Sequence, residues 1–144
     1  MISRMLSADL PRHVGERITI AGWLHRRRKL KSVTFLVIRD RSGLAQVVLP
    51  PDQDCELAEE TVLQVNGLVV ANDQAPGGAE LTEPVLTPLS GPADPPPFDL
   101  YRPAVAATLP TILDHAPTTL RHPVLRAGLE VAAASAAGFR TALT

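Results

Sequence analysis

Aromatic residues and cysteine are scarce in this sequence. The 144 residues include three Phe, one Trp, one Tyr and a single cysteine, Cys55, which cannot form an internal disulfide. No apolar run is long enough for a signal sequence or a membrane span. We therefore expect a cytoplasmic protein that does not enter a membrane.

Motifs that carry catalysis or bind metals are also missing. There is no phosphate-binding glycine loop and no nucleophile with an evident base. The one carboxylate pair, Glu59-Glu60, fits a solvated helix end. The four histidines are not spaced with other ligands as in a metal site: His13, His25, His115 and His122. We expect a binding module with no catalytic residue, no metal and no cofactor of its own.

The net charge of −1 conceals a strong asymmetry along the chain. Residues 1–49 carry ten Lys or Arg against three acids, whereas residues 50–144 carry four against twelve. Five of the six residues from Arg26 to Lys31 are cationic, and such a cluster attracts a polyanion before any contact forms. The N-terminal part is therefore the candidate nucleic-acid-binding half.

Alternating apolar residues and turn residues predict an all-β domain. Three strands in a meander, a short helix and two more strands are the element order of an OB-fold, a five-stranded Greek-key barrel that binds oligonucleotides. We expect strands at 17–24, 34–39, 44–49, 61–71 and 79–89, with the helix at 52–60 between the third and fourth strands, and a further short helical piece around Ser7 to His13.

The second strand places one of the few aromatic residues beside charge. Successive side chains of a strand point to opposite faces, so Leu36 and Ile38 share one face while Phe35 and Arg39 share the other. Because an arginine such as Arg39 is seldom buried unpaired, we expect the face of Leu36 to line the core. Phe35 then lies on the outer face, where it could stack on a base. The alternative is that a loop or the later helix covers Phe35.

The third strand places Gln46 on the face opposite to Val47. A side-chain amide there could donate to a base edge and accept from it at the same time. The alternative is an ordinary exposed strand glutamine.

Ten of the fourteen prolines fall between Pro84 and Pro123, which predicts a stiff linker or hinge after the barrel. From Pro123 an apolar stripe recurs at helical spacing and predicts a C-terminal α-helix whose stripe must cover the barrel or a partner. The expected organisation is an OB-fold domain at 1–90, a Pro-rich hinge at 91–122 and a helix at 123–144.

The chain resembles the N-terminal anticodon-binding domain of aspartyl-tRNA synthetases, in the archaeal-type form. The resemblance rests on GWLHRRRKLKSVTFLVIRDRSGLAQVV and extends through GLVVANDQAPGGAEL to TLRHPVLRAGLEVAAASAAGFRTAL, which is similar to the opening helix of that family's catalytic domain. It implies a tRNA partner for this chain. For a full-length parent it implies an ATP-dependent ligase that uses Mg²⁺ and is a homodimer.

The resemblance also implies residue roles. Phe35 matches the aromatic residue that stacks on the central anticodon uridine, and Gln46 matches the glutamine that hydrogen-bonds the same base. Arg28 matches a contact to the stem-loop, and Glu80 a glutamate near the anticodon. Together with the basic run and one loop position, the candidate nucleic-acid-binding residues are His25, Arg26, Arg27, Arg28, Lys29, Lys31, Phe35, Gln46, Pro76 and Glu80.

Two departures from the family qualify this interpretation. The three motifs for ATP, aspartate and the acceptor end do not occur here, so the chain is a fragment of an enzyme or a stand-alone relative. Strict members of the family carry a tryptophan at the position of His25 and a lysine near Pro76. This chain has neither, which predicts relaxed recognition of tRNA(Asp) and tRNA(Asn), unless Glu80 or another loop residue discriminates instead. The alternatives are an OB-fold that binds single-stranded nucleic acid without aminoacylation and a protein-interaction module.

Overall fold

The computed structural model describes residues 4–53 and 55–143. The chain divides into two units, Met1–Pro95 and Pro96–Thr144, which we describe separately.

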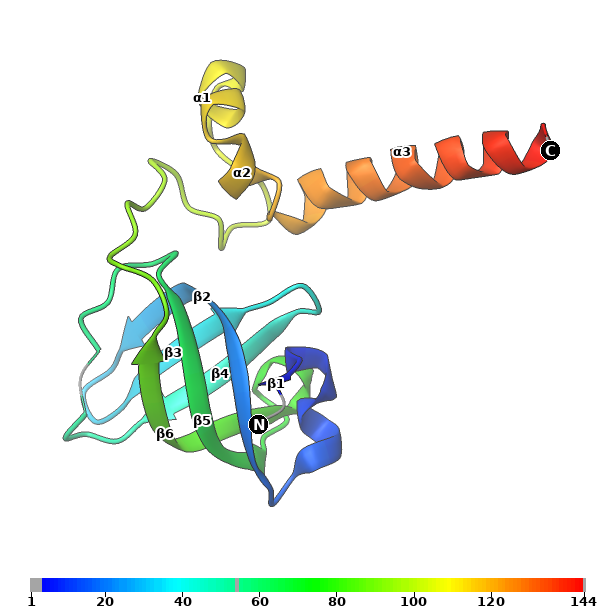
Figure 1. Cartoon of the computed structure of the whole chain (residues 1–144). Helices are drawn as coiled ribbons and strands as arrows, with labels where there is room; N and C mark the ends of the chain where they lie inside the picture. The colour runs from blue at the N-terminus through cyan, green and yellow to red at the C-terminus, as the bar shows by residue number, and fades with distance from the viewer. Residues whose placement is uncertain (1–3, 54, 144) are drawn as a thin grey trace. The chain divides into compact units, whose positions relative to one another are not determined.

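The first unit is a closed β-barrel (Figure 1), and the expected OB-fold is confirmed. Its strands follow one another in the order β1-β2-β3-β4-β6-β5, and β5 returns to pair with β2, which closes the barrel. The two-residue β1 adds to the edge of the five main strands by parallel pairing with β2. The strand bounds are β1 Arg4–Met5, β2 Arg17–Lys29, β3 Thr34–Arg39, β4 Leu44–Leu49, β5 Val62–Ala71 and β6 Ala79–Pro88.

The barrel interior is filled by one alternate set of side chains from each strand. Leu36 and Ile38 are fully buried, so the face assignment made from alternation is confirmed for β3. Branched aliphatic residues dominate this core, as expected for strands that bury one face. The largest fully buried apolar side chains of the strands are Ile20, Leu24, Leu36, Ile38, Val47, Leu49, Leu63, Val65, Val69 and Leu81.

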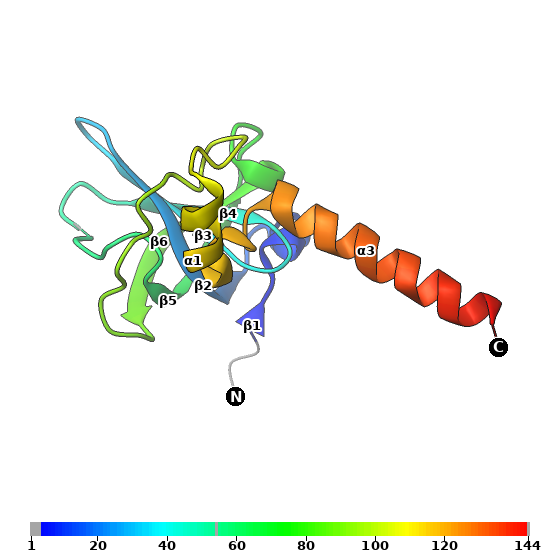
Figure 2. The same ribbon diagram turned by 90° about the horizontal axis from the view of Figure 1, so that it is seen from above.

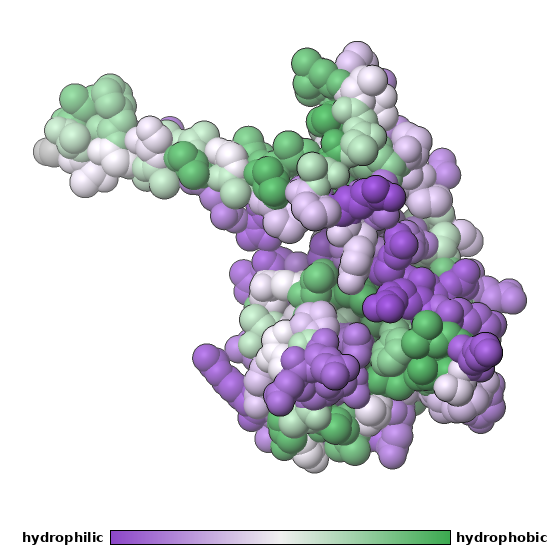
Figure 3. All heavy atoms as spheres, turned by 180° about the vertical axis from the view of Figure 1, so that it is seen from behind, coloured by the Kyte–Doolittle hydropathy of each residue, from purple (hydrophilic) through white to green (hydrophobic). Residues whose placement is uncertain are grey.

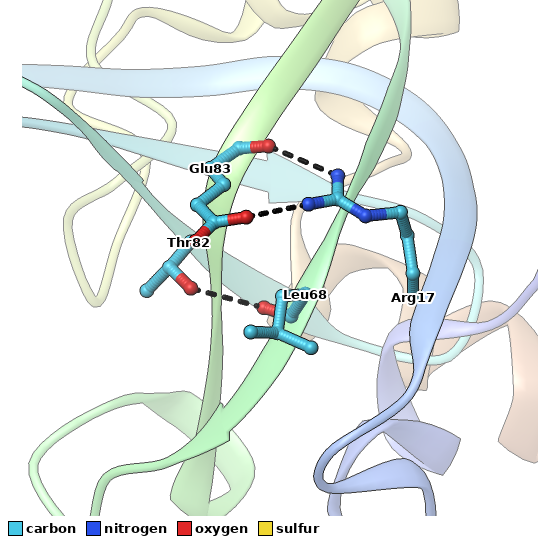
Figure 4. Close-up of polar contacts among 4 residues, drawn as sticks. All are labelled: Arg17, Leu68, Thr82 and Glu83. Carbon is cyan, nitrogen blue, oxygen red and sulfur yellow. Dashed lines mark hydrogen bonds and ion pairs between the residues drawn. The ribbon is translucent and has the colours of Figure 1, made fainter.

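Polar contacts join β2 to the bend of β6 where the barrel closes (Figure 4). The Arg17 guanidinium donates to the Glu83 carboxylate at 2.6 Å and to the Glu83 carbonyl at 3.2 Å. Nearby, the Thr82 hydroxyl donates to the Leu68 carbonyl at 3.4 Å. A Cβ atom at Gly67 would lie 2.9 Å from the Thr82 carbonyl oxygen, so the approach of β5 to β6 requires glycine there.

The prediction of a helix at 52–60 is wrong. The described residues of this segment form turns and irregular structure. The backbone N–H of Glu60, which a helix over 52–60 would use, donates to the Leu24 carbonyl at 2.7 Å. The Leu24 N–H donates to the Thr61 carbonyl at 2.9 Å, so the end of this segment is bonded to β2. Glu60 also has φ of 70°, which a right-handed helix cannot accommodate.

The first predicted strand is longer than expected. It continues beyond Leu24 to Lys29, so most of the basic run lies on β2 and not in a turn. The pairing of β2 with β3 shifts register between Leu24 and Arg26, which makes His25 the extra residue of a β-bulge.

In its described residues, 96–143, the second unit contains three helices, α1 (Leu109–Asp114), α2 (Ala116–Thr119) and α3 (Pro123–Ala142). The C-terminal helix is therefore confirmed, and two short helices lie within the segment expected to be a hinge. His122 caps α3 because its Nδ1 accepts the Val124 N–H at 3.3 Å, while its Nε2 lies 2.8 Å from the Arg102 carbonyl.

α3 is one continuous helix (Figure 2). None of its residues is buried. Apolar side chains lie exposed along its length (Figure 3). Leu129 and Phe139 are among the exposed large apolar residues. In the part of the chain that the structure describes, no helix combines the length and the hydropathy needed to span a membrane.

Asp40 holds the N-terminal 3₁₀ segment η1 (Ser7–His13) against the β3–β4 turn. Its Oδ2 accepts the Ser7 N–H at 2.7 Å, and its Oδ1 accepts the N–H and the hydroxyl of Ser42 at 2.7 and 2.6 Å. Burial by itself raises the pKa of the Asp40 carboxyl, but the hydrogen bonds from Ser42 and Ser7 outweigh burial, so the pKa lies below its usual value.

Replacing Asp40 by Asn should lower the free energy of unfolding by roughly 1–3 kcal/mol at pH 7, because buried donors lose their acceptor. Since the folded-state pKa is depressed, the advantage of the wild type is fully present above the unfolded pKa near 3.8. It should then disappear as the pH falls through the lower folded pKa. Denaturant unfolding of the wild type and the variant, from pH 7 down into acid, measures this difference in the free energy of unfolding. A difference that stays constant into acid would contradict the account.

Candidate nucleic-acid interface

The strand register brings distant parts of the chain together in rows on the outer face of the barrel. Arg28, Phe35 and Val48 form one row across β2, β3 and β4. In the adjacent row Arg26 pairs with Val37, Val37 with Gln46, and Gln46 with Glu80 of β6. We call the set Arg26, Arg28, Phe35, Gln46 and Glu80 the platform.

Phe35 is the aromatic centre of the platform. It is only partly buried, whereas Leu36 beside it is fully buried and faces the core. The partly exposed ring has Arg28 directly across the strand pair on one side and Val48 on the other. This arrangement offers an aromatic surface with a cation beside it, as nucleobase stacking requires.

The basic run is divided between the two faces of β2. Arg26 and Arg28 lie on the platform, whereas Arg27 pairs with Leu36 and points the other way, where its Nη1 donates to the Cys55 carbonyl. Lys29 ends the strand and Lys31 follows in the turn, and both are exposed. Parity in the strand thus separates candidate contacts that the sequence run alone could not distinguish.

His25 lies buried in the barrel wall and not on the platform. Its Nδ1 is 2.7 Å from Nη1 of Arg39, whose Nη2 donates to the Glu60 carboxylate at 2.7 Å. The Arg39 guanidinium also lies 5.7 Å from the centre of the Trp23 ring. Arg39 is therefore buried with partners, and it fixes the strand end next to the platform.

Gln46 and Glu80 are in direct contact. Nε2 of Gln46 donates to Oε2 of Glu80 at 2.8 Å, and Nδ2 of Asn72 donates to the same oxygen at 2.9 Å. The sequence reasoning placed Gln46 and Glu80 in the site but missed Asn72. An Asn at the end of a strand signals a turn, but nothing in the sequence signals its contact with Glu80.

Pro76 lies in the loop between β5 and β6 and begins the 3₁₀ turn η2 (Pro76–Gly78). The loop is closed at its base by Asn72 N–H, which donates to the Gly78 carbonyl at 3.0 Å. Gly77 and Gly78 have φ of 76° and 84°, values that glycine adopts without strain. Pro76 is partly exposed at the end of the platform that carries Glu80.

Among residues 4–53 and 55–143, no three His, Cys, Asp or Glu side chains gather where they could hold a metal ion.

Residues 18–89 match the tRNA anticodon family, described as an OB-fold nucleic acid binding domain. The chain belongs to this family. The matched region of this OB-fold nucleic acid binding domain contains every residue of the platform and the loop of Pro76.

An aspartate–tRNA(Asp/Asn) ligase from Thermus thermophilus is 40% identical over 142 residues, which cover 95% of this chain and 32% of the ligase. A solved asparaginyl-tRNA synthetase from Pyrococcus horikoshii superposes with a TM-score of 0.71 at 28% identity, over 85% of this chain and 30% of that one. An aspartyl-tRNA synthetase from Entamoeba histolytica shares the fold at a TM-score of 0.82 and 16% identity, over 99% and 37%. The chain spans about a third of the length of these relatives.

Arg28 and Arg27 form a matched pair for testing the face assignment. Arg28→Ala should reduce the slope of log affinity against log salt for a single-stranded RNA by about 0.7, because one phosphate contact is lost. Arg27→Ala should leave the slope nearly unchanged, since that guanidinium binds a loop carbonyl on the other face. Binding isotherms at several salt concentrations measure both. Equal changes in the two variants would contradict the division of the basic run.

Proposed function

We propose that this domain reads the anticodon of tRNA(Asp) and tRNA(Asn) as the N-terminal domain of an aspartate–tRNA ligase. The observation that carries the proposal is the platform itself, where Phe35 and Gln46 lie on one face with Arg26 and Arg28. The relationship to an aspartate–tRNA(Asp/Asn) ligase over nearly the whole chain supports the same assignment.

Binding begins with charge in this proposal. The cations of the run from Arg26 to Lys31 attract the phosphates of the anticodon loop, and Arg28 holds the backbone beside Phe35. The unstacked central base then lies on the Phe35 ring, and the Gln46 amide hydrogen-bonds its edge. Lys29 and Lys31, at the exposed end of the hairpin, extend the contact toward the stem.

The proposal extends to a longer parent enzyme in the cytoplasm. That parent would use ATP and Mg²⁺ to activate aspartate and act as a homodimer, with this chain supplying tRNA binding only. In it, residues 1–90 are the anticodon-binding domain, 91–122 connect the domains, and 123–144 begin the catalytic domain. The exposed apolar residues of α3 then face the rest of that domain.

Recognition of the third anticodon base is relaxed in this proposal. Aspartate and asparagine tRNAs share the central uridine and differ at the third base, C against U. Strict relatives carry a lysine near the position of Pro76 and a tryptophan at the position of His25. In this chain Pro76 has no side-chain donor, and His25 is buried against Arg39. The parent would accordingly form Asp-tRNA(Asn) as well as Asp-tRNA(Asp).

Phe35→Ala should weaken binding of an aspartate-type anticodon stem-loop by roughly 1–3 kcal/mol and leave the fold intact, because its ring is partly exposed. The matched control is Leu36→Ala, which should cost about 2–5 kcal/mol of stability through a core cavity. Titration calorimetry and thermal unfolding separate the two effects. If Phe35→Ala leaves affinity unchanged, stacking on Phe35 and with it the anticodon assignment fails. If scrambled RNA binds as tightly as the stem-loop, a non-specific single-strand binder is favoured.

Pro76→Lys should restore discrimination at the third anticodon base. The native chain should bind stem-loops whose third anticodon base is C or U with affinities that differ by less than about tenfold, or roughly 1.4 kcal/mol. The lysine variant should favour C, because N3 of cytosine can accept from the ammonium beside the O2 carbonyl, whereas N3 of uracil carries a proton. A native preference beyond that limit would contradict relaxed recognition.

A further inference from the structure

The Gln46 side chain has two flip states that match opposite kinds of base. With Oε1 toward an imino N–H and Nε2 toward a neighbouring carbonyl, it fits uracil or guanine. In the flipped state it fits cytosine or adenine, which present a ring-nitrogen acceptor beside an amino donor. An amide free to rotate would therefore accept either class, so what holds Gln46 decides what it reads.

Glu80 holds the Gln46 amide in one state. A carboxylate only accepts hydrogen bonds, so the end of the amide that lies 2.8 Å from Oε2 of Glu80 is the NH₂ group. Flipping the amide would turn its carbonyl oxygen toward the carboxylate, which places two acceptors against each other. The second N–H of Nε2 and the carbonyl oxygen Oε1 are then presented in a fixed order.

Asn72 in turn holds Glu80. Its Oδ1 accepts the Gln74 N–H at 3.0 Å, which fixes the orientation of its amide and directs Nδ2 to Oε2 of Glu80 at 2.9 Å. Backbone bonding at both ends keeps this geometry, because Asn72 N–H binds the Gly78 carbonyl and Glu80 is paired with Val70 across β5 and β6. The chain of hydrogen bonds thus runs from the Gln74 backbone N–H through the side chains of Asn72, Glu80 and Gln46.

We propose that Asn72 and Glu80 are positioning residues that fix the Gln46 amide in the state that selects a base with an imino N–H, uracil or guanine, against cytosine or adenine. The proposal rests on the proposed function, because it takes the platform as the base-binding surface. Asn72 and Glu80 act through Gln46 and need no contact with the RNA.

The test compares stem-loops that differ only in the central anticodon base, U or C. The wild-type chain should prefer U by about tenfold or more. Glu80→Gln replaces an obligate acceptor by an amide that can also donate, so Gln46 can flip. The ratio should fall toward one, and binding of the C stem-loop should improve. Asn72→Asp places a second carboxylate against Glu80 and should lower the ratio as well.

Asn66→Asp is the matched control, since Asn66 lies on β5, the strand that Asn72 follows, and donates to the Thr19 hydroxyl at 2.9 Å. This variant should keep the wild-type ratio. Equal weakening toward both RNAs in the Glu80 and Asn72 variants, or an unchanged ratio, would overturn the positioning role alone. A wild-type chain that does not prefer the stem-loop over scrambled RNA would instead overturn the proposed function.

A second measurement needs no variant. In the wild-type chain the Gln46 side-chain amide protons should exchange with solvent more slowly than those of the exposed Gln74, because Nε2 of Gln46 is held by its hydrogen bond to Oε2 of Glu80 at 2.8 Å. Gln46 amide protons that exchange as fast as those of Gln74 would overturn the inference even if a variant fails to fold.

Discussion

The candidate nucleic-acid interface depends on one constraint, the register of β2, β3, β4 and β6 in a closed barrel. Alternation sends Leu36 and Arg27 to one side of the barrel wall and Phe35 and Arg28 to the other, and a slip of one residue would exchange them. Closure of β5 onto β2 fixes that register, since no strand can slip without breaking the circuit. The same pairing brings Gln46 to Glu80, which lie far apart in sequence.

Features encoded by local patterns could be predicted from the sequence. Alternation identified β3 and β4 and the burial of Leu36, and the order of strands identified the OB-fold. The absence of a helix at 52–60 could not be predicted from local patterns, because long-range hydrogen bonds of Leu24 with Glu60 and Thr61 hold the end of this segment to β2. The extension of β2 through the basic run likewise depends on pairing with β3, which overrides the turn suggested by five cations.

The candidate site shows a similar division. Phe35 and Gln46 could be predicted from the sequence because each is an unusual residue at a definite parity in a short strand. The burial of His25 could not be predicted, since it follows from a β-bulge and from contact with Arg39. Arg39 in turn is buried because Glu60 and His25 supply its partners. Charge, an aromatic surface and an oriented amide meet on one face of the barrel, and only the last depends on contacts that alternation cannot reveal.

The central claim is that the platform is the RNA-binding surface, and backbone and side-chain resonances of the full chain test it most directly. On titration with an aspartate-type anticodon stem-loop, the account predicts that shifts concentrate at Arg28, Phe35 and the Gln46 side-chain amide, followed by the loop of Pro76. The amides of α3 should change little. Shifts confined to α3, or spread over the opposite face of the barrel, would contradict the account.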